Sequence, residues 1–150
     1  MKLATALSER ADVQRRLSVL QSRLKNNAKV QEGEEPAEDP KLLLKELDTL
    51  LERLEWLMAR INLTNSQTFC GETCLTELLA RRDCLAKRVS ILRAFLDTAS
   101  QTVDRYSQKE IKILPTVKVS VLQKQVDDAS KALRELDEQI QSLNWTTELL

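Results

Sequence analysis

The fold is decided by residues 39–63, DPKLLLKELDTLLERLEWLMARINL, in which leucine and isoleucine recur at alternating spacings of four and three. This spacing is the a/d pattern of a helix that packs along one seam. A second apolar row recurs every seven residues beside the seam and contains Leu44, Leu51 and Met58. A stripe this wide is typical of a helix that is buried on two sides in a bundle. The seam itself consists of Leu43, Leu47, Leu50, Leu54, Leu57 and Ile61.

The composition of the whole chain is helical and balanced in charge. Among 150 residues, 23 Lys and Arg balance 23 Asp and Glu, and there are only two Gly and three Pro. Few Gly and Pro leave few places for tight turns, which favours long helices. The absence of net charge gives no reason to expect nucleic acid as a partner. No apolar run approaches the ~20 residues that span a bilayer, and the length predicts one domain, residues 1–150.

Similar seams elsewhere predict three further helices. The expected helices cover about residues 3–26, 40–62, 73–106 and 121–144. The predicted fold is all-α, with long antiparallel helical hairpins that form a four-helix, coiled-coil-like bundle in a single helical domain. At ~1.5 Å per residue the third helix would be roughly 50 Å long, so it needs several neighbours or another subunit to cover it.

The ends of these helices carry recognisable signals. Asp39 is a good N-cap and Pro40 a good first residue for the second helix. Gly71, in a cluster of Asn, Thr and Ser, predicts a turn before the third helix. Ser120 and Gln123 have the spacing of a capping box for the fourth.

Residues 107–120, SQKEIKILPTVKVS, have a different pattern. Ile111 and Ile113, then Val117 and Val119, alternate with polar residues on either side of a proline. Period two and β-branched side chains predict a short extended or β segment near 110–119. Two short strands cannot bury their own apolar edge, so we expect a neighbouring chain to cover it. These four residues and Trp145, in an apolar C-terminal stretch, are the candidate oligomer interface.

Arg10 and Arg82 are the polar candidates in the predicted core, because each occupies a seam position. A buried guanidinium needs an acceptor, so either arginine could form an anion site or an inter-subunit ion pair. The alternative is that both side chains reach from the edge of the seam to solvent. Cys70, Cys74 and Cys84 lack the spacing of a zinc site, and the chain has no His, so neither a metal nor a cofactor is expected.

Several strings together resemble the septicolysin-like family, small bacterial all-helical proteins of unknown function. The resemblance implies an all-helical fold, and the family name implies a membrane-acting cytolysin. The strings are NNAKVQEGEEPAEDP from Asn26, INLTN from Ile61, DRYS from Asp104, EIKILPTV from Glu110, LQKQVD from Leu122 and LNWTTELL from Leu143.

Wide apolar stripes and an apolar tail favour a structural or interaction role over catalysis. We expect a cytoplasmic protein whose partner is itself, in a closed homo-oligomer such as a hexameric ring. No nucleic acid or membrane partner is expected, and the sequence does not indicate a small-molecule ligand. Residues 1–16 lack the apolar segment of a signal peptide, and no catalytic set is recognisable, so an enzyme is not expected. The alternative is the septicolysin-like cytolysin.

Overall fold

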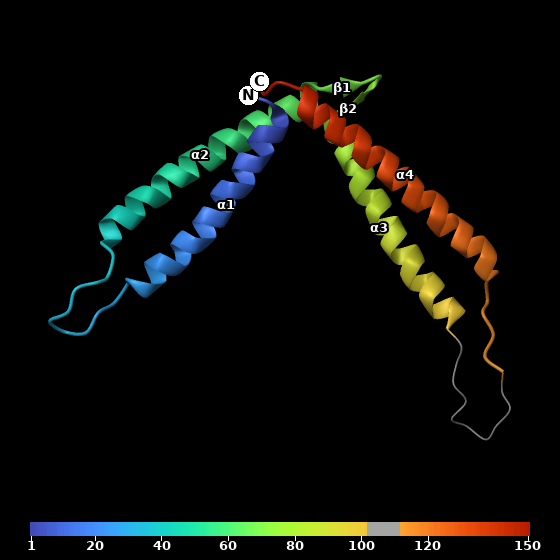
Figure 1. Ribbon diagram of the computed structural model, residues 1–150, viewed down its shortest axis with the longest axis horizontal. Coiled ribbons are helices and arrows are strands. Elements are labelled where there is room, and N and C mark those ends of the chain that lie inside the picture. Colours follow the sequence, from blue (N-terminus) through green and yellow to red (C-terminus); the bar gives the residue numbers. More distant parts are fainter. Residues whose placement is uncertain (102–111) are drawn as a thin grey trace. The chain divides into compact units, whose positions relative to one another are not determined.

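The computed structural model describes residues 1–101 and 112–150, which form four helices and one small β-hairpin (Figure 1). The all-α prediction is confirmed: α1 and α2 form one helical hairpin, and α3 and α4 form another. In chain order the elements are α1 (Leu3–Asn26), α2 (Pro40–Gln67), β1 (Phe69–Cys70), β2 (Thr73–Cys74), α3 (Leu75–Ser100) and α4 (Val119–Thr146).

The chain divides into two compact units. The first comprises Met1–Leu75 with Ser142–Leu150, and the second comprises Thr76–Gln141. Each unit contains one helical hairpin, and each is described by itself below. The interpretation of residues 1–150 as one domain stays a prediction.

The first unit is built on a seam in which, away from the clasped end, each helix buries one residue per heptad. The ion pair between Glu9 and Arg53 sets an antiparallel register that places Val13 opposite Leu50. Burial of a leucine at such a position contributes roughly 1.5–3 kcal/mol to stability. The heptad-spaced buried residues are Ala6, Val13 and Leu20 on α1, and Leu43, Leu50 and Leu57 on α2.

The helix α2 is longer than the sequence predicts, since it continues past residue 62 to Gln67. Thr64 occupies the next position in the heptad row of Leu50 and Leu57 and is fully buried. Its hydroxyl donates to the main-chain oxygen of Arg60 at 2.8 Å, so the polar group is satisfied inside the helix. The Asn, Thr and Ser cluster, which predicts a break, is therefore accommodated in the last helical turns.

The connection between α1 and α2 is tied down at both ends. Asp39 caps α2 by accepting a hydrogen bond from the backbone N–H of Lys41 at 2.9 Å, as predicted. Asn27 follows the last turn of α1 and is buried. Its amide nitrogen donates to the main-chain oxygen of Arg23 at 2.8 Å, and its amide oxygen accepts from the N–H of Glu38 at 2.9 Å.

The β-hairpin lies at residues 69–74, where the sequence predicts a turn alone. Phe69 pairs with Cys74, and the connecting residues are Gly71 and Glu72. Gly71 has a φ of +63° and Glu72 has no positive φ, which matches a type II′ turn with glycine in its first central position. This hairpin takes the first two residues expected for the third helix, so α3 begins at Leu75.

The predicted β segment near 110–119 is not a strand in the residues that the structure describes. Residues 112–118 lie outside all helices and strands, and α4 begins at Val119. Val117 and Val119 pack instead against the core of their own unit, formed by Leu96, Leu122 and Val126. The main-chain oxygen of Lys118 accepts hydrogen bonds from the N–H groups of Val121 and Leu122, so α4 begins at Val119 and Ser120 lies inside the helix. Ser120 is therefore not the N-cap, and the predicted capping box is wrong. The third helix ends at Ser100; residues 102–111 lie outside the described part.

The ends of the described chain close against each other within the first unit, in a clasp of residues 1–3 and 147–150. The N–H of Leu3 donates to the main-chain oxygen of Thr147 at 2.9 Å, and that of Leu149 donates to the oxygen of Met1 at 2.8 Å. The N–H of Leu150 donates to the hydroxyl of Thr64 at 3.1 Å. The clasp thereby covers Leu3, which is fully buried.

Candidate interaction surface

One face of the α1–α2 hairpin carries interhelical ion pairs. The guanidinium of Arg53 donates to both carboxylate oxygens of Glu9, at 2.7 and 2.9 Å. Further along the hairpin, the carboxylate of Glu46 forms ion pairs with the guanidinium groups of Arg16, at 3.7 Å, and Arg23, at 3.3 Å. These residues follow one another at heptad intervals on each helix, so they form a charged face along the seam.

Ion pairs with arginine lower the pKa values of two carboxylates of this hairpin. Hydrogen bonds from Arg53 lower the pKa of Glu9, while its partial burial opposes this effect. Hydrogen bonds from Arg23 likewise lower the pKa of Glu38, which lies just before Asp39, the N-cap of α2. Both carboxylates are therefore ionised at neutral pH, and the charges fix the register of the two helices.

The other face of this hairpin is apolar and open. Residues two apart on a helix lie about 160° apart around it, so Leu51 points away from the side that carries Arg53. Leu17 and Leu24 of α1 and Leu47 and Leu51 of α2 line an open groove of about 430 Å³. Leu54 and Met58 continue these rows by heptad spacing, as does Leu44. We define the apolar face as Leu17, Leu24, Leu44, Leu47, Leu51, Leu54 and Met58.

The outer row of the apolar face is half-exposed. Leu44, Leu51 and Met58 are exposed by 50, 47 and 46%. The sequence predicts that α2 is buried on two sides, and within the described chain only the side toward α1 is buried. The described chain thus leaves a repeating apolar row on α2 without a cover.

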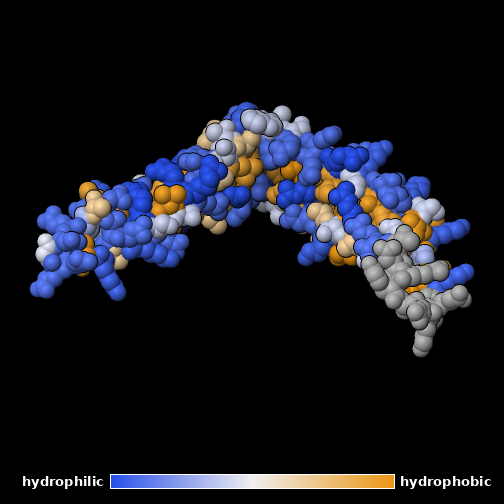
Figure 2. Space-filling model, turned by 60° about the horizontal axis from the view of Figure 1, so that its bottom comes forward, coloured by the Kyte–Doolittle hydropathy of each residue, from blue (hydrophilic) through white to orange (hydrophobic). Residues whose placement is uncertain are grey.

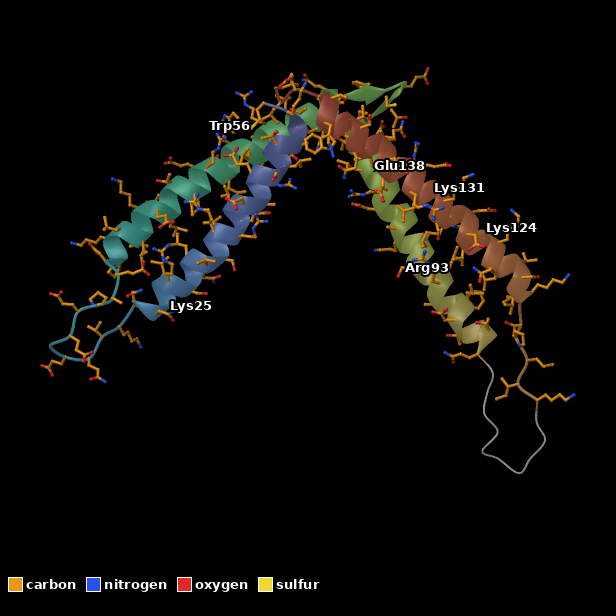
Figure 3. All side chains as sticks on the ribbon, in the orientation of Figure 1. Lys25, Trp56, Arg93, Lys124, Lys131 and Glu138 are labelled. Carbon is orange, nitrogen blue, oxygen red and sulfur yellow. The ribbon has the colours of Figure 1, made fainter. Side chains whose placement is uncertain are left out.

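Trp56 lies on α2 (Figure 3), and its ring contacts two arginines. The guanidinium carbon of Arg53 lies 4.5 Å from the centre of the ring, and that of Arg60 lies 5.9 Å from it. The cation–π contact with Trp56 and the hydrogen bonds to Glu9 together hold the guanidinium of Arg53. The exposed tryptophan therefore supports the charged face.

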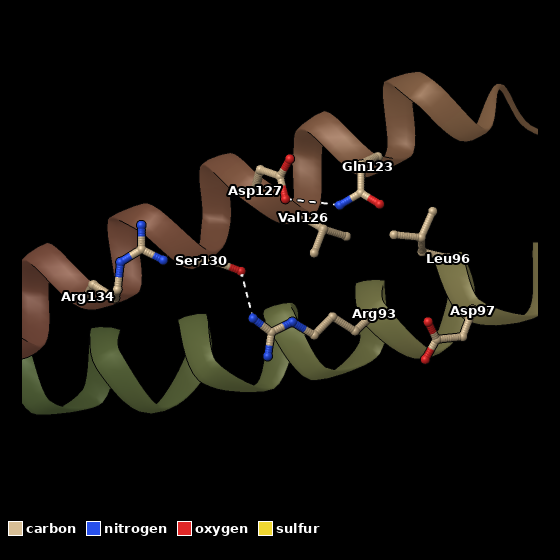
Figure 4. Close-up of a pocket in the computed structure, with 8 residues that line it drawn as sticks. All are labelled: Arg93, Leu96, Asp97, Gln123, Val126, Asp127, Ser130 and Arg134. Carbon is tan, nitrogen blue, oxygen red and sulfur yellow. Dashed lines mark hydrogen bonds between the residues drawn. The ribbon is translucent and has the colours of Figure 1, made fainter. Parts of the chain in front are cut away.

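The second unit has an open polar groove of about 530 Å³ between α3 and α4 (Figure 4). Arg93 donates to the hydroxyl of Ser130 at 3.2 Å, and the amide of Gln123 donates to Asp127 at 2.9 Å. Two arginines and two aspartates line the groove, so its charges cancel. It has neither the excess positive charge of an anion site nor the converging carboxylates of a cation site.

The two seam arginines occupy different surroundings. Arg10 is half-buried on α1, and within the described residues it forms no ion pair or hydrogen bond. Arg82 is half-buried on α3, and its guanidinium donates to the neighbouring Asp83 at 2.7 and 3.1 Å. An anion site or an inter-subunit ion pair at Arg10 and Arg82 stays a prediction.

The candidate interface residues are not brought together as one patch by any contact in the described chain. Ile113 and Trp145 are 70 and 67% exposed, whereas Val117 and Val119 are partly buried in their own unit. Ile111 lies outside the described residues. Burial of this set between subunits stays a prediction.

The cysteines lie near the β-hairpin and on α3. Cys70 and Cys74 belong to β1 and β2, and Cys84 is exposed on α3. In the part of the chain that the structure describes, no three His, Cys, Asp or Glu side chains are placed to hold a metal ion.

The sequence reasoning missed the individual ion pairs, although a signal for them exists. Glu9, Arg16 and Arg23 each precede a seam position of α1, and Glu46 and Arg53 each precede one of α2. Charges of opposite sign at these flanking heptad positions are typical of interhelical pairs. Pairing individual residues requires the register of the two helices, which the sequence does not give.

Comparisons with known proteins find relatives without an assigned function. A family model described as a family of unknown function (DUF6847) matches residues 10–149. The chain is similar to a solved structure described as a functionally unknown conserved protein from Corynebacterium diphtheriae. The identity is 43%, the TM-score is 0.92, and the match covers 100% of this chain and 99% of that chain. No curated protein matches the chain.

The resemblance to the septicolysin-like family is wrong. Strings on which it rests, such as INLTN and LQKQVD, lie inside the stretch that matches a different family. Short polar strings in helical proteins recur because caps and helix surfaces use few residue types, so they identify a family poorly. The cytolysin function implied by the resemblance loses its basis. Separately, none of the described helices has both the length and the apolar composition needed to cross a membrane.

Proposed function

We propose a structural role for this chain, which belongs to DUF6847, a family of unknown function. The protein self-assembles in the cytoplasm into a closed homo-oligomer and has no catalytic activity. Its partner is a further copy of itself, and neither nucleic acid nor a membrane takes part. A hexameric ring is one such closed form.

The apolar face of the α1–α2 hairpin is the observation that carries this proposal. Single exposed leucines are ordinary, but a row repeating every seven residues along one helix is not. Figure 2 shows one side of the molecule, where apolar side chains reach the surface between charged ones. Ile113, Leu114 and Trp145 are also more than half exposed, so further apolar area is open to a neighbouring copy.

The charge distribution supports a partner of the same kind. The whole chain has equal numbers of basic and acidic residues, so identical copies approach without long-range repulsion. The absence of His, and a polar groove whose side chains bond to each other, support a role other than catalysis.

Size-exclusion chromatography with light scattering tests the proposal. We expect a single species at micromolar concentration whose mass is a small multiple of 17.2 kDa. A monomer over the whole range from about 1 to 100 µM would overturn it, because a closed assembly with a standard interface forms in this range.

A further inference from the structure

We infer that the apolar face of the α1–α2 hairpin binds the same face of a second copy, so that two hairpins form a four-helix bundle about a two-fold axis. The inference rests on the proposed function and adds to it the surface and the manner of pairing. It concerns only the first unit and the seven residues that define the apolar face.

The difference in burial between the two halves of the seam supports this pairing. The row of heptad-spaced residues that contains Val13 and Leu50, called the d row here, is buried because the other helix of the hairpin covers it. In the second row of the seam, called the a row, Leu17, Leu24, Leu47 and Leu54 are only half-buried, whereas Leu3 and Ile61 at its ends are buried. Along the middle of the hairpin the two helices cover only the d row, and the a row becomes fully buried there when two further helices pack on it.

The size of the face suits a weakly associating dimer. On α2 the face runs from Leu44 to Met58, which is roughly 22 Å at ~1.5 Å per residue, and two helices of ~10 Å diameter give a width of roughly 20 Å. The face therefore offers roughly 450 Å² per copy, which is less than the ~800 Å² that each partner buries in a standard interface and is in the range of weak, transient association.

The charges around the face suit an identical partner. The groove at the centre of the face is lined by the uncharged polar residues Ser18 and Gln21. Arg10 continues the row of Leu17 and Leu24 one heptad before Leu17, so a positive charge lies toward that end of the row. At the margin of the face Lys25 lines the groove, and Asp48 lies beside Leu51, three residues away on the helix. A margin with both signs can match its own copy, whereas a margin of one sign would repel it.

The first experiment compares two lysine substitutions by light scattering. Leu51→Lys places a charge in the apolar face; Val19→Lys places one at a residue that is 60% exposed and about 160° away from Leu17 around α1. We expect Leu51→Lys to weaken the association at least tenfold and Val19→Lys to leave it unchanged, with helical circular dichroism retained in both.

The second experiment locates the contact without disturbing the apolar side chains. A photo-crosslinking amino acid replaces Lys25, which lines the groove in the last turn of α1 (Figure 3), or Arg15, which is exposed and lies about 160° from Leu17 around α1. In a mixture of isotopically light and heavy chains, the probe at 25 should link to the α1–α2 hairpin of another copy. The probe at 15 should form no such link.

The outcomes separate the inference from the proposed function. If the wild-type protein is oligomeric, Leu51→Lys keeps its full mass and the probe at 25 links only within its own chain, the apolar face is not the interface and the inference is overturned. The proposed self-assembly would then stand, with its interface elsewhere. If the wild-type protein is a monomer, the proposed function fails and the inference with it. Should Leu51→Lys fail to fold, the crosslinks alone decide between these outcomes.

Discussion

Arg53 of α2 holds Glu9 of α1 through two parallel hydrogen bonds, of 2.7 and 2.9 Å, while the ring of Trp56 lies 4.5 Å from its guanidinium carbon. One arginine thus connects the two helices and is itself fixed by a neighbour one turn away. The carboxylate is held in a defined position on a surface that remains partly wet, since the side chains of Glu9 and Arg53 are 34 and 41% exposed.

The first prediction concerns the pH dependence of this pair. Arg53 lowers the pKa of Glu9 below its ordinary value of 4.5 in the folded protein. A lowered folded-state pKa contributes stability above the unfolded-state pKa, and this contribution is lost as the pH falls through the folded-state pKa. Glu9→Gln should therefore lower the free energy of unfolding at pH 7 by about 0.5 kcal/mol, after allowance for solvent screening.

Urea unfolding of Glu9→Gln and the wild-type protein, followed by circular dichroism at pH 7 and at pH 3, measures the effect. The difference at pH 7 should shrink at pH 3, because the carboxylate of Glu9 is protonated progressively as the pH falls through its lowered folded-state pKa. An equal difference in the free energy of unfolding at pH 7 and at pH 3 would show that the ion pair contributes nothing to stability. Arg53→Met is not a clean control, because it also removes the contact with Trp56.

The second prediction concerns the contribution of a buried seam residue to stability. Leu57 is fully buried, so Leu57→Ala should destabilise the protein by about 2–5 kcal/mol through lost burial and the cavity that it leaves. The matched control is Val19→Ala, where the side chain is mostly exposed and the cost should stay below about 0.5 kcal/mol. Thermal unfolding followed by circular dichroism separates these values. Similar midpoints for both variants would mean that the d row is not the core of the hairpin.

The third prediction concerns the buried hydroxyl of Thr64. It donates to the main-chain oxygen of Arg60 and accepts from the N–H of Leu150, at 2.8 and 3.1 Å. Thr64→Val keeps the shape but removes the acceptor, so the amide of Leu150 should exchange with solvent at least tenfold faster. Thr64→Ser keeps the hydroxyl and should preserve the slow exchange of this amide even where overall stability falls. Unchanged exchange in Thr64→Val would show that this bond does not hold the C-terminal residues.

The fourth prediction concerns the turn of the β-hairpin. Gly71 has a φ of +63°, and a Cβ placed there meets no atom within 4 Å. The cost of Gly71→Ala therefore comes from the left-handed backbone alone and should be about 1–2 kcal/mol. Gly71→Asn should cost less, because asparagine tolerates this conformation better. Thermal unfolding of the two variants tests the order, and equal stability of alanine and glycine at this position would contradict the assigned turn.

The heptad pattern was sufficient to predict the four helices and the buried row of α2. Leu43, Leu50 and Leu57 were assigned to the seam from spacing alone, and all three are buried. The pattern did not distinguish them from Leu47 and Leu54, which are half-buried. Spacing identifies the side of a helix that is apolar, but the number of neighbours decides how much of that side is covered, and local sequence does not contain this number.

The errors fall where polar side chains can bond to the backbone in more than one way. A threonine at position 64 is compatible with the end of a helix or with its interior. Here the helix continues, and the buried hydroxyl of Thr64 donates to the main-chain oxygen of Arg60 and accepts from the N–H of Leu150, a residue far away in the sequence. Alternating valines near Val117 read as a strand, yet Val117 and Val119 pack on the ends of two helices. In both cases tertiary contacts override the local preference.

The clasp at the chain ends also bears on the order of events during synthesis. Lys2 and Glu148 meet at 2.7 Å, although nearly the whole chain separates them. The α1–α2 hairpin is continuous in the sequence and can form once Gln67 has left the ribosome. At ~5–20 residues per second, the residues after Glu148 follow roughly 4–16 s later. Throughout that interval Leu3 lacks its contact with Thr147, so the start of α1 stays open to a chaperone until residues 147–150 have emerged.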